Sequence, residues 1–350
     1  MKEIRLGGIP IGDNHPPFII AEMSGNHNQS LKKALEIVDA AAAAGAHALK
    51  LQTYTADLMT LDLDTGDFFI QDPDSLWQGR SLFNLYEEAH TPWEWHQPIY
   101  DRCRERGIIP FSTPFHPKAV DFLEQLDTPF YKIASFENND LPLIRHVART
   151  GKPLIVSTGM ASIGEIEELV RTAKEAGCDQ IVLLKCTSTY PASPADSHLR
   201  TIPHLKQMFG CEAGLSDHTP GIGAAVAGVA LGATVIEKHF TISRAEGGVD
   251  AAFSLEPREM AMLVSETKTA WEALGGVQYG LSRKEIGSLK FRRSLYISRD
   301  VSPGETLTED NVRIIRPGYG LPPKYMEQIV GRKVAVDAKA GTPVSWALFG

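Results

Sequence analysis

Two histidines, each at the polar end of an apolar, strand-like run, are the first candidates for chemistry in this sequence. His218 lies in GLSDHT (214–219) and His239 in TVIEKHFT (234–241). Two neutral imidazoles with a carboxylate and water suit a borderline divalent metal such as Mn, Co, Fe or Zn, rather than Mg or Ca alone. Because a single histidine is more often packed or solvated than a ligand, the pair predicts a metal site only if the fold brings the two together.

Other reactive side chains follow the same pattern, since nearly every apolar run ends in one. Lys50, Lys132 and either Lys238 or Lys185, with neighbouring hydroxyls, would form an anion site for a phosphate plus a carboxylate. Capping of the next helix, expected of Ser162 ahead of Glu165, explains such residues singly but not on eight runs at once. These residues are Glu22, Lys50 and Gln52, Ser112 and Thr113, Lys132, Ser135 and Glu137, Ser157 and Thr158, Lys185 and Thr187, Ser216 and His218, and Lys238 and His239.

The apolar runs alternate with amphipathic, helix-like segments, and this alternation predicts a parallel sheet because a parallel return needs a crossover helix. Eight units over about 260 residues favour a closed (β/α)₈ barrel, whose active site lies at the carboxyl ends of the strands. No GxGxxG follows the first run, which disfavours a dinucleotide-binding sheet. The predicted strands are 18–26, 48–54, 108–115, 130–137, 153–160, 180–191, 211–219 and 234–241.

In such a barrel the seventh and eighth strands are neighbours, so the imidazoles of His218 and His239 can converge. Glu22, on the first strand, lies beside the eighth and can reach the metal or its water. A metal, a carboxylate and several lysines predict a site for a phosphorylated acid and an electrophile that the metal polarises.

Composition narrows the possible partners and compartment. The chain has 350 residues, 43% of them hydrophobic, and a net charge of −8, which argues against nucleic acid and against anionic membranes. No apolar run approaches the ~20 residues of a membrane span, and the N-terminus lacks a signal-peptide pattern. Four cysteines without CxxC spacing indicate reduced thiols and a cytoplasmic protein.

The composition changes near Glu285, where a stretch rich in Gly and Pro with short β-like pieces begins. The pattern Asp300–Gly304 recurs as Asp337–Gly341, which predicts two similar β-turn units. We therefore expect a barrel at 1–280, a linker at 281–290 and a small β domain at 291–350. So small a domain buries little core alone and should lean on another surface.

The motifs together resemble the sialic acid synthase family, whose members condense phosphoenolpyruvate with an N-acylated amino sugar to give a nine-carbon 2-keto acid. The resemblance covers the whole chain, and from about residue 290 it is to the antifreeze-like (SAF) domain, a β-clip. It implies a TIM barrel followed by a SAF domain. The motifs are IAEMSGNHNQS (20–30), LKLQTY (49–54), FSTPF (111–115), YKIAS (131–135), STGM (157–160), KCTSTYP (185–191), GLSDHT (214–219) and EKHFT (237–241).

The resemblance also implies roles for residues. His218 and His239 match metal ligands, with Mn²⁺ expected and Co²⁺ or Mg²⁺ as alternatives. Many family members read CTNxYP where this chain has Ser188, a shorter donor to phosphate. Catalytic roles fall to Glu22, Lys50 and Lys132. Phosphoenolpyruvate positions are Lys50, Thr113, Lys132, Ser135, Ser157, Ser188 and Ser216. Sugar positions are Gln52, Glu137, Tyr190, Asp250 and Arg316.

Two stretches, 77–96 and 247–257, most resemble the pseudaminic acid branch, whose sugar is 2,4-diacetamido-2,4,6-trideoxy-L-altrose. N-acetylneuraminate and legionaminate synthesis are the alternatives within the family. Four aromatic residues could receive the 6-methyl and extra acetamido groups, although core packing explains the two in WEWH equally well. They are Trp77, Trp93, Trp95 and Phe253.

The last open questions are the role of Arg316 in assembly and the functions that compete with a synthase. Arg316 leads the stiff segment RPGYGLPP (316–323), which is either a solvated loop or, as the resemblance implies, an arm that reaches the partner chain's sugar site in a domain-swapped homodimer. A metal-dependent hydrolase on the same barrel would need no phosphoenolpyruvate lysines. A non-catalytic carbohydrate-binding protein would bind sugar without turnover.

Overall fold

The chain forms two compact units, Met1–Gly275 and Gly276–Gly350, and each is described by itself. The computed structural model describes residues 4–73 and 75–350. The finer division expected from the sequence, with its linker at 281–290, stays a prediction.

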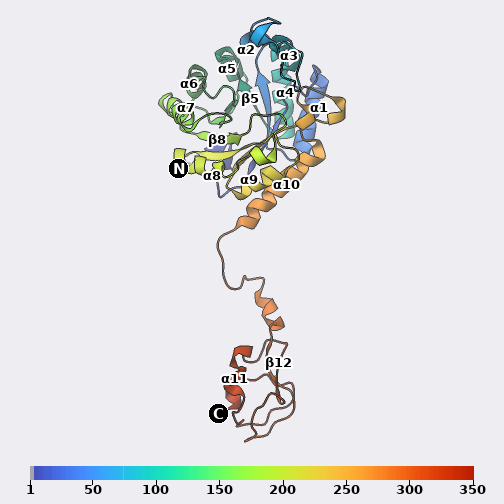
Figure 1. Cartoon of the computed structure of the whole chain (residues 1–350), viewed down its shortest axis with the longest axis vertical. Coiled ribbons are helices and arrows are strands. Elements are labelled where there is room, and N and C mark those ends of the chain that lie inside the picture. The colour runs from blue at the N-terminus through green and yellow to red at the C-terminus, as the bar shows by residue number, and fades with distance from the viewer. Residues whose placement is uncertain (1–3, 74) are drawn as a thin grey trace. The chain divides into compact units, whose positions relative to one another are not determined.

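The first unit is a closed barrel of eight parallel strands, in the order β10-β3-β4-β5-β6-β7-β8-β9 (Figure 1). This confirms the predicted TIM barrel, and each predicted run contains its strand. Several strands end before the predicted runs do, and the residues that follow are loops at the carboxyl ends. The strands are β3 (Phe18–Glu22), β4 (Ala48–Thr53), β5 (Ile109–Pro114), β6 (Tyr131–Ile133), β7 (Leu154–Ser157), β8 (Ile181–Cys186), β9 (Glu212–Ser216) and β10 (Val235–His239).

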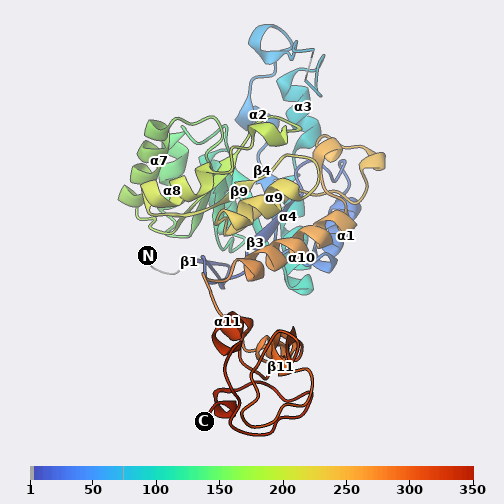
Figure 2. The ribbon, with the colours of Figure 1, turned by 60° about the horizontal axis from the view of Figure 1, so that its bottom comes forward.

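Helices cover the outside of the ring of strands (Figure 2). Apolar residues at helical spacing, such as Ala34, Ile37 and Val38, are buried against the strands. Ser162 and Glu165 form the predicted capping box. The helices are α1 (Leu31–Ala43), α2 (Ala56–Met59), α3 (Leu82–Ala89), α4 (Trp93–Arg106), α5 (Pro117–Glu124), α6 (Leu141–Ala148), α7 (Ile163–Glu175), α8 (Thr201–Phe209), α9 (Gly223–Ala230) and α10 (Pro257–Leu274).

The interior of the barrel has an apolar floor. An N-terminal hairpin that the sequence did not predict, β1 (Ile4–Leu6) and β2 (Ile9–Ile11), packs its apolar residues against it. Because side chains alternate along a strand, the inward positions above this floor are free to carry polar groups at the carboxyl ends. The floor includes Phe18, Ile20, Ala48, Phe111, Phe130, Ile155, Val182, Leu184 and Val235.

The second unit contains the antiparallel pair β11 (Ser294–Ile297) and β12 (Val312–Ile315), the short helix α11 (Met326–Ile329) and a core of its own. Both repeat segments end in a glycine of the left-handed region, Gly304 at φ 87° and Gly341 at φ 88°. Backbone hydrogen bonds in both directions, of 2.9 and 3.0 Å, join Val301 to Ala338. The predicted turn units are therefore paired. No helix in the described part of the chain is long and apolar enough to cross a bilayer.

Candidate active site

The parallel register places the reactive ends of three neighbouring strands at one level. His239 is opposite Glu22, and Glu22 is opposite Lys50. These side chains share the inward face with the floor residues two positions earlier, Glu22 with Ile20 and Lys50 with Ala48. The site is thus a polar layer directly above the apolar floor.

Four buried charges alternate in sign across this layer. The ammonium of Lys50 lies 2.7 Å from a Glu22 carboxylate oxygen and 3.4 Å from one of Glu237, which also lies 3.3 Å from the ammonium of Lys132. Two hydroxyls extend the network: Lys50 donates to Thr113 at 3.3 Å, and Ser216 donates to Glu237 at 2.9 Å. The ammonium groups of Lys50 and Lys132 therefore lie close together in a buried space, where both could contact one bound anion.

Burial and the neighbouring charges perturb the acids and bases of this layer. Burial raises the pKa of Glu22, against the opposing effect of Lys50. Burial would also raise the pKa of Glu237, but Lys132 and Lys50 outweigh it and lower the pKa to about 2. The pKa of Lys132 is lowered, chiefly by burial. Glu22 is therefore the more basic carboxylate of the two.

Glu237 is the functional candidate that the sequence reasoning missed. It lies in the motif EKHFT (237–241), but neither the sequence pattern nor the family resemblance assigns it a role. Its position two residues before His239 on one strand gives both side chains the same face, and this spacing was the signal that could have found it.

The lysine adjacent to His239 does not join the site, contrary to expectation. Lys238 faces outward because it alternates with its neighbours, and its ammonium contacts Asp217 at 2.8 Å and two carbonyl oxygens, of Thr219 and Gly221. Lys185 bonds instead to the Cys186 carbonyl oxygen at 2.6 Å and to Thr187. The described ion pairs join only Lys50 and Lys132 to the carboxylates of the polar layer.

The histidine rings converge, with centroids 5.3 Å apart. His218 Nδ1 is 3.0 Å from the Thr187 carbonyl oxygen, so it donates there and leaves Nε2 as the lone-pair nitrogen. His239 Nδ1 is buried without a hydrogen-bond partner among the described residues, 3.6 Å from an Asp250 oxygen. Burial lowers the pKa of His239 well below its usual value. A neutral imidazole with an unsatisfied nitrogen is suited to bind a metal.

No group of three or more His, Cys, Asp or Glu side chains in residues 4–73 and 75–350 is arranged to hold a metal. The two histidines therefore supply a partial ligand set. Such a set fits a metal whose remaining positions belong to water or substrate, as in open catalytic sites.

The remaining hydroxyls assigned to phosphoenolpyruvate gather close by. Ser188 donates to Ser135 at 2.8 Å, so the shorter side chain at this position still joins the cluster. The Ser157 hydroxyl is buried and without a partner among the described residues. An unsatisfied buried hydroxyl is costly unless a ligand completes it.

The sugar candidates of the first unit border the same space. Gln52 donates to Glu22 at 3.3 Å and to Ser24 at 3.2 Å, and Ser24 donates to Asp250. The Tyr190 ring lies 4.5 Å from that of His218. Burial raises the pKa of Glu137 to about 7. Arg316 is exposed in the second unit, and its role toward the sugar stays a prediction.

The four aromatic residues divide into two kinds. Phe253 lies 4.9 Å from the His239 ring and Trp77 lies 6.2 Å from Tyr190, both measured between centroids. Trp93 instead stacks on Phe122 at 4.7 Å, and Trp95 packs edge-on against His27 at 5.6 Å. Core packing thus explains the tryptophans of WEWH, whereas Trp77 and Phe253 line the mouth of the barrel.

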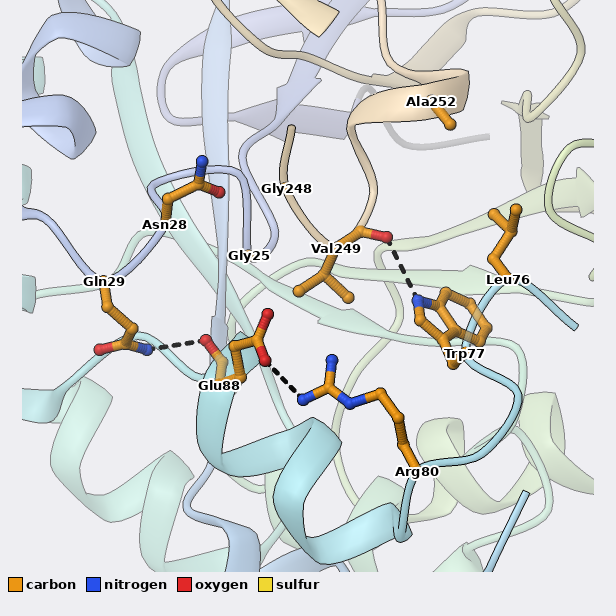
Figure 3. Close-up of a pocket in the computed structure, with 10 residues that line it drawn as sticks. All are labelled: Gly25, Asn28, Gln29, Leu76, Trp77, Arg80, Glu88, Gly248, Val249 and Ala252. Atoms are coloured by element: carbon orange, nitrogen blue, oxygen red, sulfur yellow. Dashed lines mark hydrogen bonds and ion pairs between the residues drawn. The ribbon is translucent and has the colours of Figure 1, made fainter. Parts of the chain in front are cut away.

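A pocket of about 520 Å³ adjoins this mouth (Figure 3). Trp77 lines one side of it and donates from its indole nitrogen to the Val249 carbonyl oxygen at 3.2 Å. Its lining residues are Gly25, Asn28, Gln29, Leu76, Trp77, Arg80, Glu88, Gly248, Val249 and Ala252.

The chain is similar to known proteins over most of its length. The NeuB family model matches residues 37–279, and the SAF domain model matches residues 292–349. The pseudaminic acid synthase of Campylobacter jejuni serotype O:2 is 45% identical over 93% of this chain and 94% of its own, and that of Helicobacter pylori is 40% identical over 94% and 97%.

Among solved structures, an N-acetylneuraminic acid synthetase from Leptospira borgpetersenii crystallised with citrate is 33% identical, with a TM-score of 0.73, covering 83% of this chain and 96% of that one. The match to the family model spans well over half of the chain. The chain belongs to the NeuB family, the sialic acid synthases, and carries a SAF domain at its C-terminal end.

Proposed function

We propose that the chain condenses phosphoenolpyruvate with the open-chain aldehyde of 2,4-diacetamido-2,4,6-trideoxy-L-altrose and water, giving pseudaminic acid and phosphate. The observation that carries the proposal is the pair of buried lysines, Lys50 and Lys132, which share the carboxylate of Glu237, together with the two converging histidines. Three relatives that are 40%, 44% and 45% identical to this chain are pseudaminic acid synthases, which supports the choice of sugar.

The residues divide the reaction among them. Lys50 and Lys132, with the hydroxyls of Thr113, Ser135, Ser157, Ser188 and Ser216, bind the carboxylate and phosphate of phosphoenolpyruvate. Gln52, Glu137, Tyr190 and Asp250 orient the sugar so that its aldehyde carbon faces C3 of phosphoenolpyruvate. A divalent ion on His218 and His239, most simply Mn²⁺, would polarise the aldehyde.

Bond formation between C3 and the aldehyde carbon leaves positive charge at C2, to which water adds. Glu22 is the best-placed base for that water, because its raised pKa makes it a better proton acceptor than Glu237. The tetrahedral carbon then loses phosphate with cleavage of its C–O bond, and the two ammonium groups stabilise the leaving anion.

The test is phosphate release from phosphoenolpyruvate with Mn²⁺ and a panel of N-acylated hexoses. Turnover should be fastest with the diacetamido sugar, and no phosphate should form without sugar. A higher kcat/KM with N-acetylmannosamine would overturn the pseudaminate assignment but leave the family chemistry intact. Phosphate release that needs no sugar would favour a hydrolase.

We further propose that Arg316 acts in the partner's site of a domain-swapped homodimer. A guanidinium suits bidentate contact with polar groups of a sugar, and a two-fold dimer makes such an exchange reciprocal. Mixing Glu22→Ala chains with Arg316→Ala chains should restore about a quarter of the wild-type activity. Random re-association makes half of the dimers heterodimers, and each heterodimer has one complete site out of two. Proven subunit exchange without recovery would contradict the swapped arrangement.

A further inference from the structure

The pocket beside the barrel mouth has two chemically distinct sides. Leu76, Trp77, Val249 and Ala252 make one side apolar, and the other side presents a charged pair. In Figure 3, Arg80 reaches into the space between Glu88, Val249 and Trp77. A ligand group that fills this pocket therefore needs an apolar part and a hydrogen-bonding part close together.

The guanidinium of Arg80 is held in place. It contacts a carboxylate oxygen of Glu88 at 2.5 Å and the Asn84 carbonyl oxygen at 3.3 Å, both from one terminal nitrogen. A guanidinium has five N–H donors in a rigid plane, so these contacts leave donors for a ligand. Its side chain is 31% exposed, which keeps it accessible from the pocket.

Residues that would orient the sugar, Asp250 and Tyr190, lie between this pocket and the two histidines. Asp250, 3.6 Å from His239, directly follows the lining residue Val249. Trp77 contacts Tyr190, and Tyr190 contacts His218. Neither histidine lines the pocket. A sugar whose aldehyde carbon is at the histidines would thus direct a substituent beyond C2 into it.

We propose that this pocket binds the C4 acetamido group of the sugar, with the methyl against Trp77 and the carbonyl oxygen accepting from Arg80. The inference rests on the proposed function, because it places the aldehyde end at the histidines. An acetamido group has the methyl, acceptor and N–H donor that the apolar side, Arg80 and Glu88 complement. A hydroxyl at C4 would leave the apolar side unfilled, so Trp77 and Arg80 determine specificity.

The experiment compares two sugars that differ only at C4: the diacetamido-trideoxy-altrose and its analogue with a C4 hydroxyl. Arg80→Ala should lower kcat/KM for the diacetamido sugar by about tenfold to a hundredfold, the effect of losing a hydrogen bond from a charged donor. Trp77→Ala should lower it by a similar factor. Both variants should change kcat/KM for the hydroxyl analogue less than about threefold. The ratio of kcat/KM for the diacetamido sugar to kcat/KM for the hydroxyl analogue should therefore fall toward one.

Arg102→Ala is the matched control, because Arg102 is similarly exposed (33%) and pairs with Glu105 at 3.4 Å on the outer helix α4. It should leave the ratio unchanged. Equal losses on both sugars in Arg80→Ala, or a wild-type enzyme without preference between them, would overturn the inference and leave the proposed function standing. A wild-type enzyme that releases phosphate with neither sugar would instead overturn the proposed function.

Discussion

Glu237→Gln is the sharpest perturbation of the buried charge layer, because it removes one charge and keeps the shape. Glu237 is 4% exposed and accepts from Ser216 while facing Lys132 and Lys50. Its folded pKa of about 2, against 4.5 for an unperturbed glutamate, corresponds to about 3 kcal/mol of stability. Removing one partner of a buried ion pair costs about the same, 3 to 5 kcal/mol.

The sign and the upper limit of this effect follow from the same pKa values. A depressed carboxyl pKa stabilises the fold fully above pH 4.5, and the stabilisation is lost as the pH falls toward 2. At pH 7 the whole effect is present. The loss of stability also has an upper limit, because Lys132 can release its proton when Glu237 no longer carries a charge. Deprotonating a lysine with an ordinary pKa of 10.5 at pH 7 costs about 5 kcal/mol, so the variant cannot lose more than this.

The assay is urea unfolding at pH 7, followed by far-ultraviolet circular dichroism, which the helices of the barrel dominate. Glu237→Gln should lower the free energy of unfolding by about 3 kcal/mol. Phosphoenolpyruvate should stabilise this variant more than it stabilises the wild type, because the ligand replaces the missing negative charge beside the lysines. Glu212→Gln is the control: Glu212 is also buried, but it pairs with Lys206 at 3.0 Å at the opposite end of β9.

The control should be destabilised without any change in the response to phosphoenolpyruvate. The reasoning is refuted if Glu237→Gln is as stable as the wild type within about 0.5 kcal/mol. It is refuted equally if phosphoenolpyruvate stabilises the variant no more than the wild type, since the lysines would then not receive the substrate's charge.

Three further outcomes are expected. His218→Ala and His239→Ala should each abolish turnover and weaken Mn²⁺ binding measured by calorimetry, with an unchanged circular dichroism spectrum. His204→Ala, on α8, is the control and should change neither property. Activity that survives chelation in either site variant would exclude the metal assignment. Burial raises the pKa of Glu137 to about 7, so this group makes the free energy of unfolding fall as the pH rises from about 4.5 to 7. Urea unfolding across this range should give a slope against pH that is more positive in Glu137→Gln than in the wild type, by up to about 1.4 kcal/mol per pH unit, and an unchanged slope would contradict the assignment. Trp93→Ala should cost about 3 kcal/mol by urea unfolding because it removes the stack on Phe122, and a changed preference between the two sugars would contradict its packing role.

The barrel could be predicted from local pattern alone. Short apolar runs alternating with amphipathic segments need only neighbouring residues to be recognised, and eight repeats leave few architectures open. The capping box at Ser162 and Glu165 is local in the same sense, as are the glycines that end both turn units of the second domain. The chemistry-bearing residues at strand ends were found because strand ends are visible in a sequence.

Which of those residues enter the barrel depended on the tertiary structure. Lys238 and Glu237 are adjacent in the chain, yet the alternation of side chains along β10 points Glu237 into the barrel, to Lys132, and Lys238 outward, to Asp217. Trp77 and Trp93 are equally plausible as sugar contacts by residue type, but only long-range packing sends one to a pocket and the other to Phe122. A local pattern specifies that a strand exists, whereas closure of the barrel determines which side chains from distant segments meet within it.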